Sequence, residues 1–162
     1  MGAPIYDHCS EINNLIKQLI EQRTDLFGEM AEFIFPEMFV CGLRSDKPAP
    51  KKQKSILKLE GIRNARTLLS DKKYLVHGYK ERWDSCSHEK KIAAVANILR
   101  RVDYPTQEEI NKLAEKGEDF EYGKTRKPDI EDFSLFIKNL GLNWNETGTV
   151  LPDLLTDKSV EI

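Results

Sequence analysis

The stretch "YLVHGYKERWDSCSHEKKIAAVANILRRV" covers residues 74–102 and predicts the fold class by itself. Its first part is rich in aromatic and β-branched residues, so residues 73–81 favour a strand. Its second part carries apolar residues at helical spacing, which predicts one apolar helix face: Ile92, Val95, Ala96, Leu99 and Val102. A strand followed at once by an amphipathic helix is typical of a small sheet packed with helices. We therefore expect an α+β fold.

The sequence before this stretch predicts one further helix and one further strand. Ser10 is expected to cap a helix whose apolar face carries Ile12, Leu15, Ile16, Leu19 and Ile20. Residues 37–44 favour a strand, and residues 45–54, with two prolines and four lysines, favour a loop. Residues 55–71 are ambiguous, and we expect a strand or turn up to Gly61 and then a helix to about Leu69.

Two helices are predicted after this stretch. Thr106 and Glu109 form a capping box, Ile110 and Leu113 are expected to pack inward, and Gly117 ends the helix. Asp129 is expected to cap a last helix that ends at Gly141.

The composition indicates a single soluble domain. The chain has 162 residues, of which 40% are hydrophobic and 32% charged. We expect one domain over residues 1–145 and a polar, flexible tail over 146–162. No apolar run approaches the roughly 20 residues of a membrane span, and no signal peptide is recognisable, so a cytoplasmic protein without membrane contact is expected. Three cysteines without a CxxC pattern indicate reduced thiols.

His88-Glu89 opens the predicted helix and suggests the zinc-peptidase motif H-E-x-x-H. That motif needs a second histidine four residues later, but Ile92 stands there. The pair is therefore interpreted as polar residues of a first helical turn, where Glu89 suits the helix dipole. Further candidate ligands are His77, Cys86 and His88, with His8 and Cys9 more distant in sequence. Cys86-x-His88 is too tight for the usual structural zinc spacing, so no metal and no cofactor are expected.

The run "YLVHGYKERWDSCSHEKKIAAVANIL" resembles a passage of the small zincin-like metallopeptidases carried by phages and prophages. In that family a strand ends near a tryptophan, here Trp83, and the following helix carries H-E-L-x-H. "FPEMFVCGLR" and "RKPDIEDFSLFIKNLGLNW" look like two further family segments, so the resemblance covers roughly residues 30–144. It implies a zincin-like metallopeptidase scaffold.

The residues at the motif positions depart from the family. The resemblance places Asn97 at the first histidine, Ile98 at the glutamate and Arg101 at the second histidine. Pro128 stands where the resemblance implies the third ligand. A catalytic zinc needs three protein ligands, an open position for water and a general base. We therefore expect a scaffold without catalysis, and no nucleophile–base pair suggests another hydrolase.

Two functional hypotheses remain open. The first is a non-catalytic accessory protein that binds a host or phage protein, with Lys90, Asn97 and Arg101 as donors on the helix face opposite the apolar stripe. The second is nucleic-acid binding through residues 44–101, which hold 16 basic and 6 acidic residues between two acidic ends. The candidate phosphate contacts are Lys51, Lys52, Lys54, Arg63, Arg66, Lys72 and Lys73.

Overall fold

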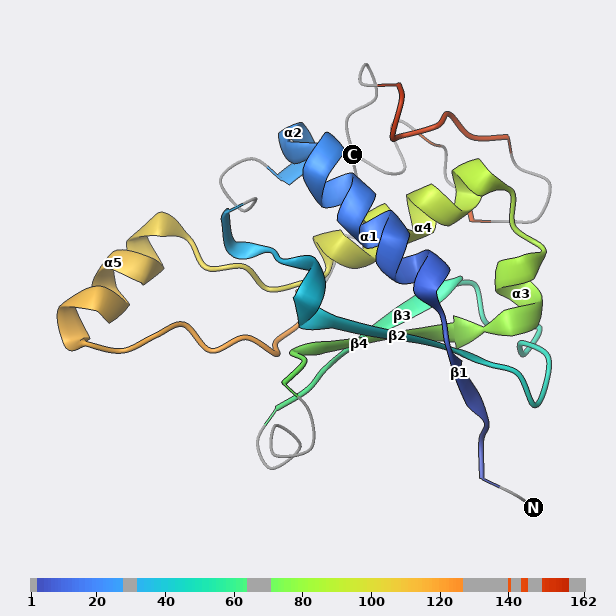
Figure 1. The fold of residues 1–162 in the computed structure, drawn as a ribbon, viewed down its shortest axis with the longest axis horizontal. Coiled ribbons are helices and arrows are strands. Elements are labelled where there is room, and N and C mark those ends of the chain that lie inside the picture. The colour runs from blue at the N-terminus through green and yellow to red at the C-terminus, as the bar shows by residue number, and fades with distance from the viewer. Residues whose placement is uncertain are drawn as a thin grey trace.

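The computed structural model describes residues 3–27, 32–63, 71–126, 140, 144–145 and 150–157. Four strands form one mixed sheet in the order β1-β2-β4-β3, and helices α1 and α4 lie on the same side of it (Figure 1). The strands are β1 (Tyr6–His8), β2 (Phe39–Arg44), β3 (Leu57–Gly61) and β4 (Tyr74–Tyr79). The helices are α1 (Ser10–Gln22), α2 (Thr24–Phe27), the 3₁₀ helix η2 (Pro36–Met38), α3 (Lys80–Asp84), α4 (His88–Arg100) and α5 (Gln107–Lys116). The predicted α+β class is confirmed.

The strand β4 lies at the centre of the sheet. It pairs in parallel with β2 and antiparallel with β3. In the parallel pair, Phe39 lies opposite Tyr74. Residues alternate along β4 between a buried face toward the helices and a half-buried face, which confirms the predicted strand. The strand predicted over 37–44 begins at Phe39, because Pro36 opens the short 3₁₀ turn before it. The ambiguous stretch up to Gly61 is strand β3.

The helix α1 covers the sheet with the apolar face that the sequence predicts. Ile12, Leu15, Ile16 and Leu19 are buried. Ser10 is the first helical residue rather than the cap, since Cys9 occupies the N-cap position without a side-chain hydrogen bond. In the described part of the chain, no helix is both long enough and apolar enough to span a membrane.

The helix α4 is buried on more than the one predicted face. Nine of its residues are buried, including the three alanines Ala93, Ala94 and Ala96. Lys90 and Asn97 expose only 4% and 6% of their surface, so the predicted solvent-facing side is wrong. The physical reason is that α4 contacts α1 as well as β3, and the hydrophobic core also includes Trp144, Leu151 and Leu154 from the end of the chain.

Residues 150–157 join this core through an arginine as well as through leucines. Arg23 is fully buried, and its guanidinium donates to the carbonyl oxygens of Leu154 and Asp157, the latter at 3.0 Å. It also forms an ion pair with Asp25 at 3.0 Å. Within the expected flexible tail, Leu151 and Leu154 are therefore buried in the core, whereas Val150 is 94% exposed. The expected domain limit at residue 145 stays a prediction.

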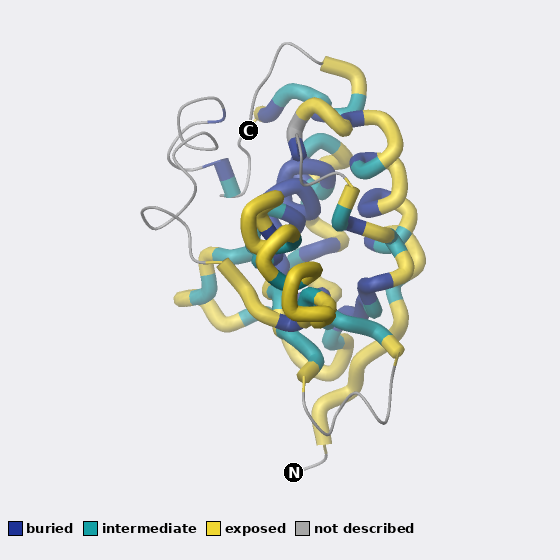
Figure 2. The backbone as a smooth tube through the Cα atoms, turned by 90° about the vertical axis from the view of Figure 1, so that its left-hand side faces the viewer, coloured by how far each residue is buried: buried dark blue, intermediate teal, exposed yellow. Residues whose placement is uncertain are grey.

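Residues 103–124, here called the arm, carry α5 away from the sheet and its helices (Figure 1). Both predicted ends of α5 are confirmed: Thr106 Oγ1 accepts from the Glu109 amide, and Gly117 follows the helix in the left-handed conformation. The expected inward packing is wrong, because no residue of α5 is buried and Ile110 and Leu113 are only half-buried (Figure 2). The predicted helices ending at Leu69 and Gly141 fall largely outside the described residues.

Candidate functional site

The motif positions lie at the C-terminal end of α4. Ile98 is buried, Asn97 is nearly so, and Arg101, the C-cap, is half-buried. Arg101 Nε donates to Asn97 Oδ1 at 3.0 Å. The two residues are four apart, so their side chains leave the same helix face one turn from each other. In H-E-x-x-H this spacing of four residues lets two histidines bind one metal ion. Here the same spacing lets Arg101 donate a hydrogen bond to Asn97.

The residues that directly follow the arm, Thr125 and Arg126, lie against this end of α4. The Arg126 amide donates to the Arg101 carbonyl at 2.6 Å, and Val102 pairs with Thr125. Near the end of the arm, Gly123 packs directly against Gly61 of β3. A Cβ at Gly61 would come within 1.6 Å of the Gly123 carbonyl oxygen. The backbone of residues 125–126 therefore lies against Arg101 and Val102, at the end of the helix that carries the motif positions. Pro128, expected at the third ligand position, lies outside the described residues.

The chemistry of these positions does not suit a catalytic zinc. The three described positions offer an amide, an alkyl chain and a guanidinium, and none of these is an imidazole or a carboxylate. An amide oxygen is a poor zinc ligand and an alkyl chain cannot take a proton from water. The permanently charged Arg101 repels a dication, and Arg126 brings a second guanidinium-bearing residue beside it.

The predicted partner-binding face requires correction. Lys90, Asn97 and Arg101 were expected to form an exposed row of donors, but Lys90 and Asn97 are buried and Asn97 is already bound by Arg101. Arg101 alone retains substantial exposure. Whether these residues contact a partner stays a prediction.

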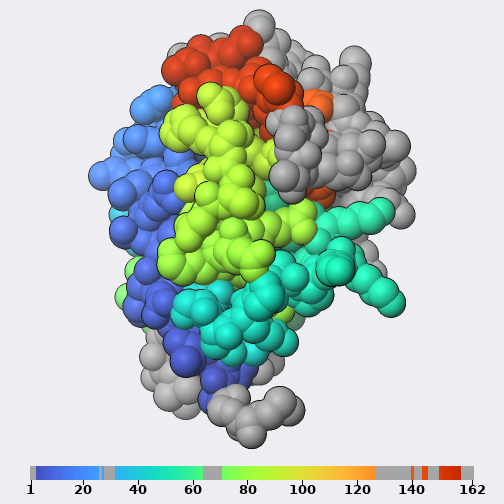
Figure 3. All heavy atoms as spheres, turned by 90° about the vertical axis from the view of Figure 1, so that its right-hand side faces the viewer, coloured from blue at the N-terminus to red at the C-terminus, as the bar shows by residue number. Residues whose placement is uncertain are grey.

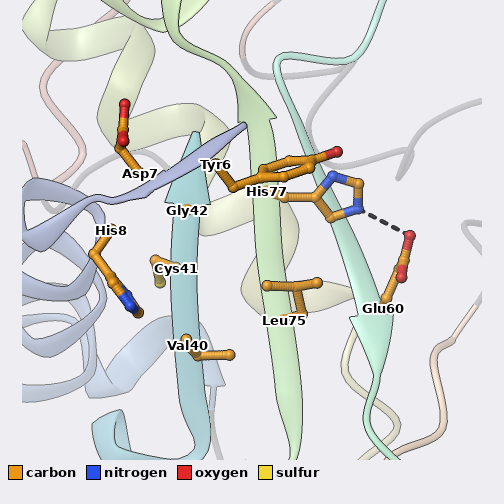
Figure 4. Close-up of a pocket in the computed structure, with 9 residues that line it drawn as sticks. All are labelled: Tyr6, Asp7, His8, Val40, Cys41, Gly42, Glu60, Leu75 and His77. Carbon is orange, nitrogen blue, oxygen red and sulfur yellow. Dashed lines mark hydrogen bonds and ion pairs between the residues drawn. The ribbon is translucent and has the colours of Figure 1, made fainter. Parts of the chain in front are cut away.

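Two histidines lie on the face of the sheet turned away from the helices. There a hollow of about 370 Å³ is lined by His8 of β1 and His77 of β4, on either side of Gly42 (Figure 4). His77 Nε2 lies 3.0 Å from Glu60 Oε1, so this imidazole already has a carboxylate partner. Cys41 also lines the hollow, and burial raises the pKa of its thiol to about 12. The contact between His77 and Glu60 was not predicted, because it depends on the pairing of β3 with β4.

The other candidate ligands lie elsewhere. Cys86 Sγ donates to the Arg82 carbonyl at 3.1 Å, and His88 is exposed at the first position of α4. Among the residues that the structure describes, no group of three His, Cys, Asp or Glu side chains is arranged to hold a metal ion. The expected lack of a metal stays a prediction.

The candidate phosphate contacts fall into two groups at opposite ends of the sheet. Lys51, Lys52 and Lys54 lie in the loop before β3, beside the Tyr79 end of β4. Arg63, Lys72 and Lys73 lie at the Tyr74 end, where Lys72 Nζ donates to the Glu37 carbonyl at 3.0 Å. Five residue steps of β4 separate the two ends by roughly 17 Å. Arg66 lies outside the described residues, and nucleic-acid binding stays a prediction.

Trp83, the tryptophan of the resemblance, joins α3 to both long helices. Its indole Nε1 donates to Glu11 Oε1 of α1 at 2.6 Å, and Lys91 Nζ of α4 lies 3.1 Å from the same oxygen. Burial raises the pKa of Glu11, but the two hydrogen bonds outweigh it and leave that pKa lowered. These contacts fix the start of α4, and hence the position of its far end.

The sequence was compared with known families, curated proteins and solved structures. A family model described as "Putative phage metallopeptidase" matches residues 5–152. This range extends beyond the expected 30–144 at both ends. No match was found among curated proteins or solved structures.

Proposed function

The chain belongs to the phage metallopeptidase family that matches residues 5–152, and we propose that it is a catalytically inactive member that acts by binding a host or phage protein. Its place of action would be the cytoplasm of the phage's host. The proposal adds to family membership the claim that zinc chemistry has been lost.

The bond between Arg101 and Asn97 carries this proposal. A peptidase helix of this family type presents two imidazoles one turn apart and a carboxylate beside the first. Here the same three positions carry Asn97, Ile98 and Arg101, and the outer two are hydrogen-bonded to each other. The Arg101 guanidinium thus stands where the family has its second imidazole ligand, and the Arg126 amide binds the Arg101 carbonyl.

Zinc content and peptidase activity test the loss of catalysis. We expect protein purified without chelator to contain far less than one zinc per chain and to leave an unfolded protein substrate uncleaved. Near-stoichiometric zinc in the wild-type chain would overturn the proposal.

A restored motif tests the assignment of positions. The variant Asn97→His/Ile98→Glu/Arg101→His/Pro128→His is expected to bind Zn²⁺ and to melt at a higher temperature with zinc than without it. The matched control is the same variant with Asn97→Ala in place of Asn97→His, which should lose that response. A restored variant that stays folded and indifferent to zinc would show that the motif positions are wrongly assigned.

The binding role has a separate test. Tagged wild-type chain is recovered from host cells that carry the phage, after cross-linking in the living cell. A single host or phage protein recovered in stoichiometric amount, and reconstituted with purified components, is the expected result. Failure of the purified pair to form a complex would remove that protein as the partner.

A further inference from the structure

The arm has a rigid base. Three tyrosine hydroxyls tie the chain on both sides of α5 to the core: Tyr104 donates to the Leu99 carbonyl at 2.7 Å, Tyr74 to the Lys124 carbonyl at 2.9 Å, and Tyr122 to the Phe33 carbonyl at 2.9 Å. The two ends of the arm also pair with each other, since the Asp103 amide donates to the Lys124 carbonyl at 3.1 Å. The arm is thus fixed at its base and projects from there.

The helix on the arm is amphipathic but buries nothing. A helix of 10 residues gains most of its stability from packing its apolar face, and it is marginal when isolated. Ile110 and Leu113 of α5 stay half-buried, and so does Phe120, which is held edge-on to Tyr122 at 5.1 Å between ring centroids. An ordered apolar face that the described part of the chain leaves half-buried suits a second polypeptide.

A groove on the arm is lined by both acidic and apolar side chains. Its volume is about 820 Å³, and the apolar residues that line it are Leu113 and Phe120. The carboxylates that line it are Asp103, Glu109, Glu118, Asp119 and Glu121. Two lysines, Lys112 and Lys124, also line it, but Lys112 Nζ lies 3.1 Å from Glu108 Oε1. The whole arm carries seven carboxylates and three lysines, so its charge is negative.

The chain itself contains a segment of complementary chemistry. The loop Lys47–Lys54, "KPAPKKQK", carries four exposed lysines, and its two prolines and one alanine supply apolar surface. Its C-terminal end is held in place, because the Arg82 guanidinium donates to the carbonyl oxygens of Gln53 and Lys54. Lysines suit the carboxylates that line the groove, and a proline segment suits the apolar and aromatic side chains among them.

The loop cannot fill the groove of its own chain. The loop leads into β3 beside the Tyr79 end of β4, whereas the base of the arm is bound to Tyr74 at the other end. Figure 1 places α5 and this loop at opposite ends of the sheet, and Figure 3 shows the loop on the face of the molecule turned away from α5. Only another copy can bring the loop to the groove.

We propose that the groove of the arm binds the Lys47–Lys54 loop of a second copy of this chain. Such a contact uses two different surfaces, so it repeats head to tail instead of closing as a symmetric pair. Because charges hold it, the association weakens with salt. The proposal is independent of whether the motif positions are active.

Sedimentation of the full chain over a wide range of concentration tests the proposal. At about 20 mM NaCl the average mass is expected to rise with concentration, and at about 500 mM NaCl, where the Debye length is only roughly 4 Å, the chain is expected to stay monomeric. An arm variant, Glu118→Gln/Asp119→Asn/Glu121→Gln, and a loop variant, Lys51→Gln/Lys52→Gln/Lys54→Gln, should each weaken association by about tenfold or more.

A mixture of the two variants separates this arrangement from other kinds of association. The arm variant keeps an intact loop and the loop variant keeps an intact arm, so together they should form a 1:1 complex that grows no further. The matched control, Glu21→Gln/Glu32→Gln/Glu37→Gln, removes three exposed carboxylates elsewhere and should associate like wild type. A chain that is monomeric at low salt, or variants whose mixture stays monomeric, would overturn the proposal. Circular dichroism checks that each variant is folded.

Discussion

Replacing Arg23 by methionine should detach the end of the chain from the core. The guanidinium donates to two backbone carbonyls, those of Leu154 and Asp157, and hydrogen bonds from a charged donor contribute about 1.5–3 kcal/mol each. Asp25 is half-exposed, so its ion pair adds at most about 1 kcal/mol. Methionine keeps most of the apolar packing of the arginine stem. We therefore expect Arg23→Met to lower the free energy of unfolding by about 3–5 kcal/mol.

Urea and thermal unfolding measure this loss. A chain of this size loses about 2–4 °C of melting temperature per kcal/mol, so the melting temperature should fall by roughly 6–20 °C. Asp25→Asn, which removes only the exposed partner, is the matched control and should cost about 1 kcal/mol or less. In a chain that ends at residue 149, Arg23→Met should cost far less than in the full chain. An equal cost in both chains would refute the reasoning, because the arginine would then not act through residues 150–157.

Three further predictions concern single residues. Gly61→Ala should destabilise the chain by about 2 kcal/mol or more in urea unfolding, because the added Cβ meets the Gly123 carbonyl. A Cβ added at Gly117 has no atom within 4 Å, but the φ of 68° strains alanine there, so Gly117→Ala should cost about 1 kcal/mol. Glu11→Gln should be slightly less stable than wild type above the unfolded carboxyl pKa of about 4.3. Because the pKa of Glu11 is lowered in the folded chain, this difference in stability should vanish as the pH falls through the folded pKa. A difference that persists at low pH would contradict this. Cys41, whose pKa burial raises to about 12, should be alkylated by iodoacetamide only as fast as the protein opens, whereas fast labelling at neutral pH in mass spectrometry would show an accessible thiolate.

The elements that could be predicted from the sequence are those that depend on local periodicity and local caps. The apolar face of α1, the alternation of β4 and the caps of α5 all come from residues within one or two turns of each other. The strand β1 could not be predicted, because its three residues are all exposed and carry no alternating pattern.

The burial of α4 could not be predicted for a different reason. Its neighbours are distant in sequence: α4 contacts α1 and β3, and the Arg126 amide binds the Arg101 carbonyl at its C-terminal end. Arg23 is buried on the same principle, since its partners Leu154 and Asp157 lie more than 130 residues away. Periodicity reports which face of a helix is apolar, but it does not report how many neighbours the helix has.

The candidate site was predictable in its chemistry and not in its setting. A helix alone brings Asn97 and Arg101, four residues apart, to the same face, and this proximity allows their hydrogen bond. The contact of Arg126 with the end of α4 depends on where the chain returns after the arm, which no local pattern indicates.

The central position of β4 has a consequence for synthesis. This strand is the last of the four to leave the ribosome, yet both β2 and β3 pair with it. Until Tyr79 has emerged, the nascent chain can form only the short β1–β2 pair, and its apolar strand faces stay exposed. The helix α4 that covers them follows directly, so at about 5–20 residues per second the sheet and its cover become available within a few seconds of each other. The four-stranded sheet therefore cannot form from the part of the chain that precedes β4.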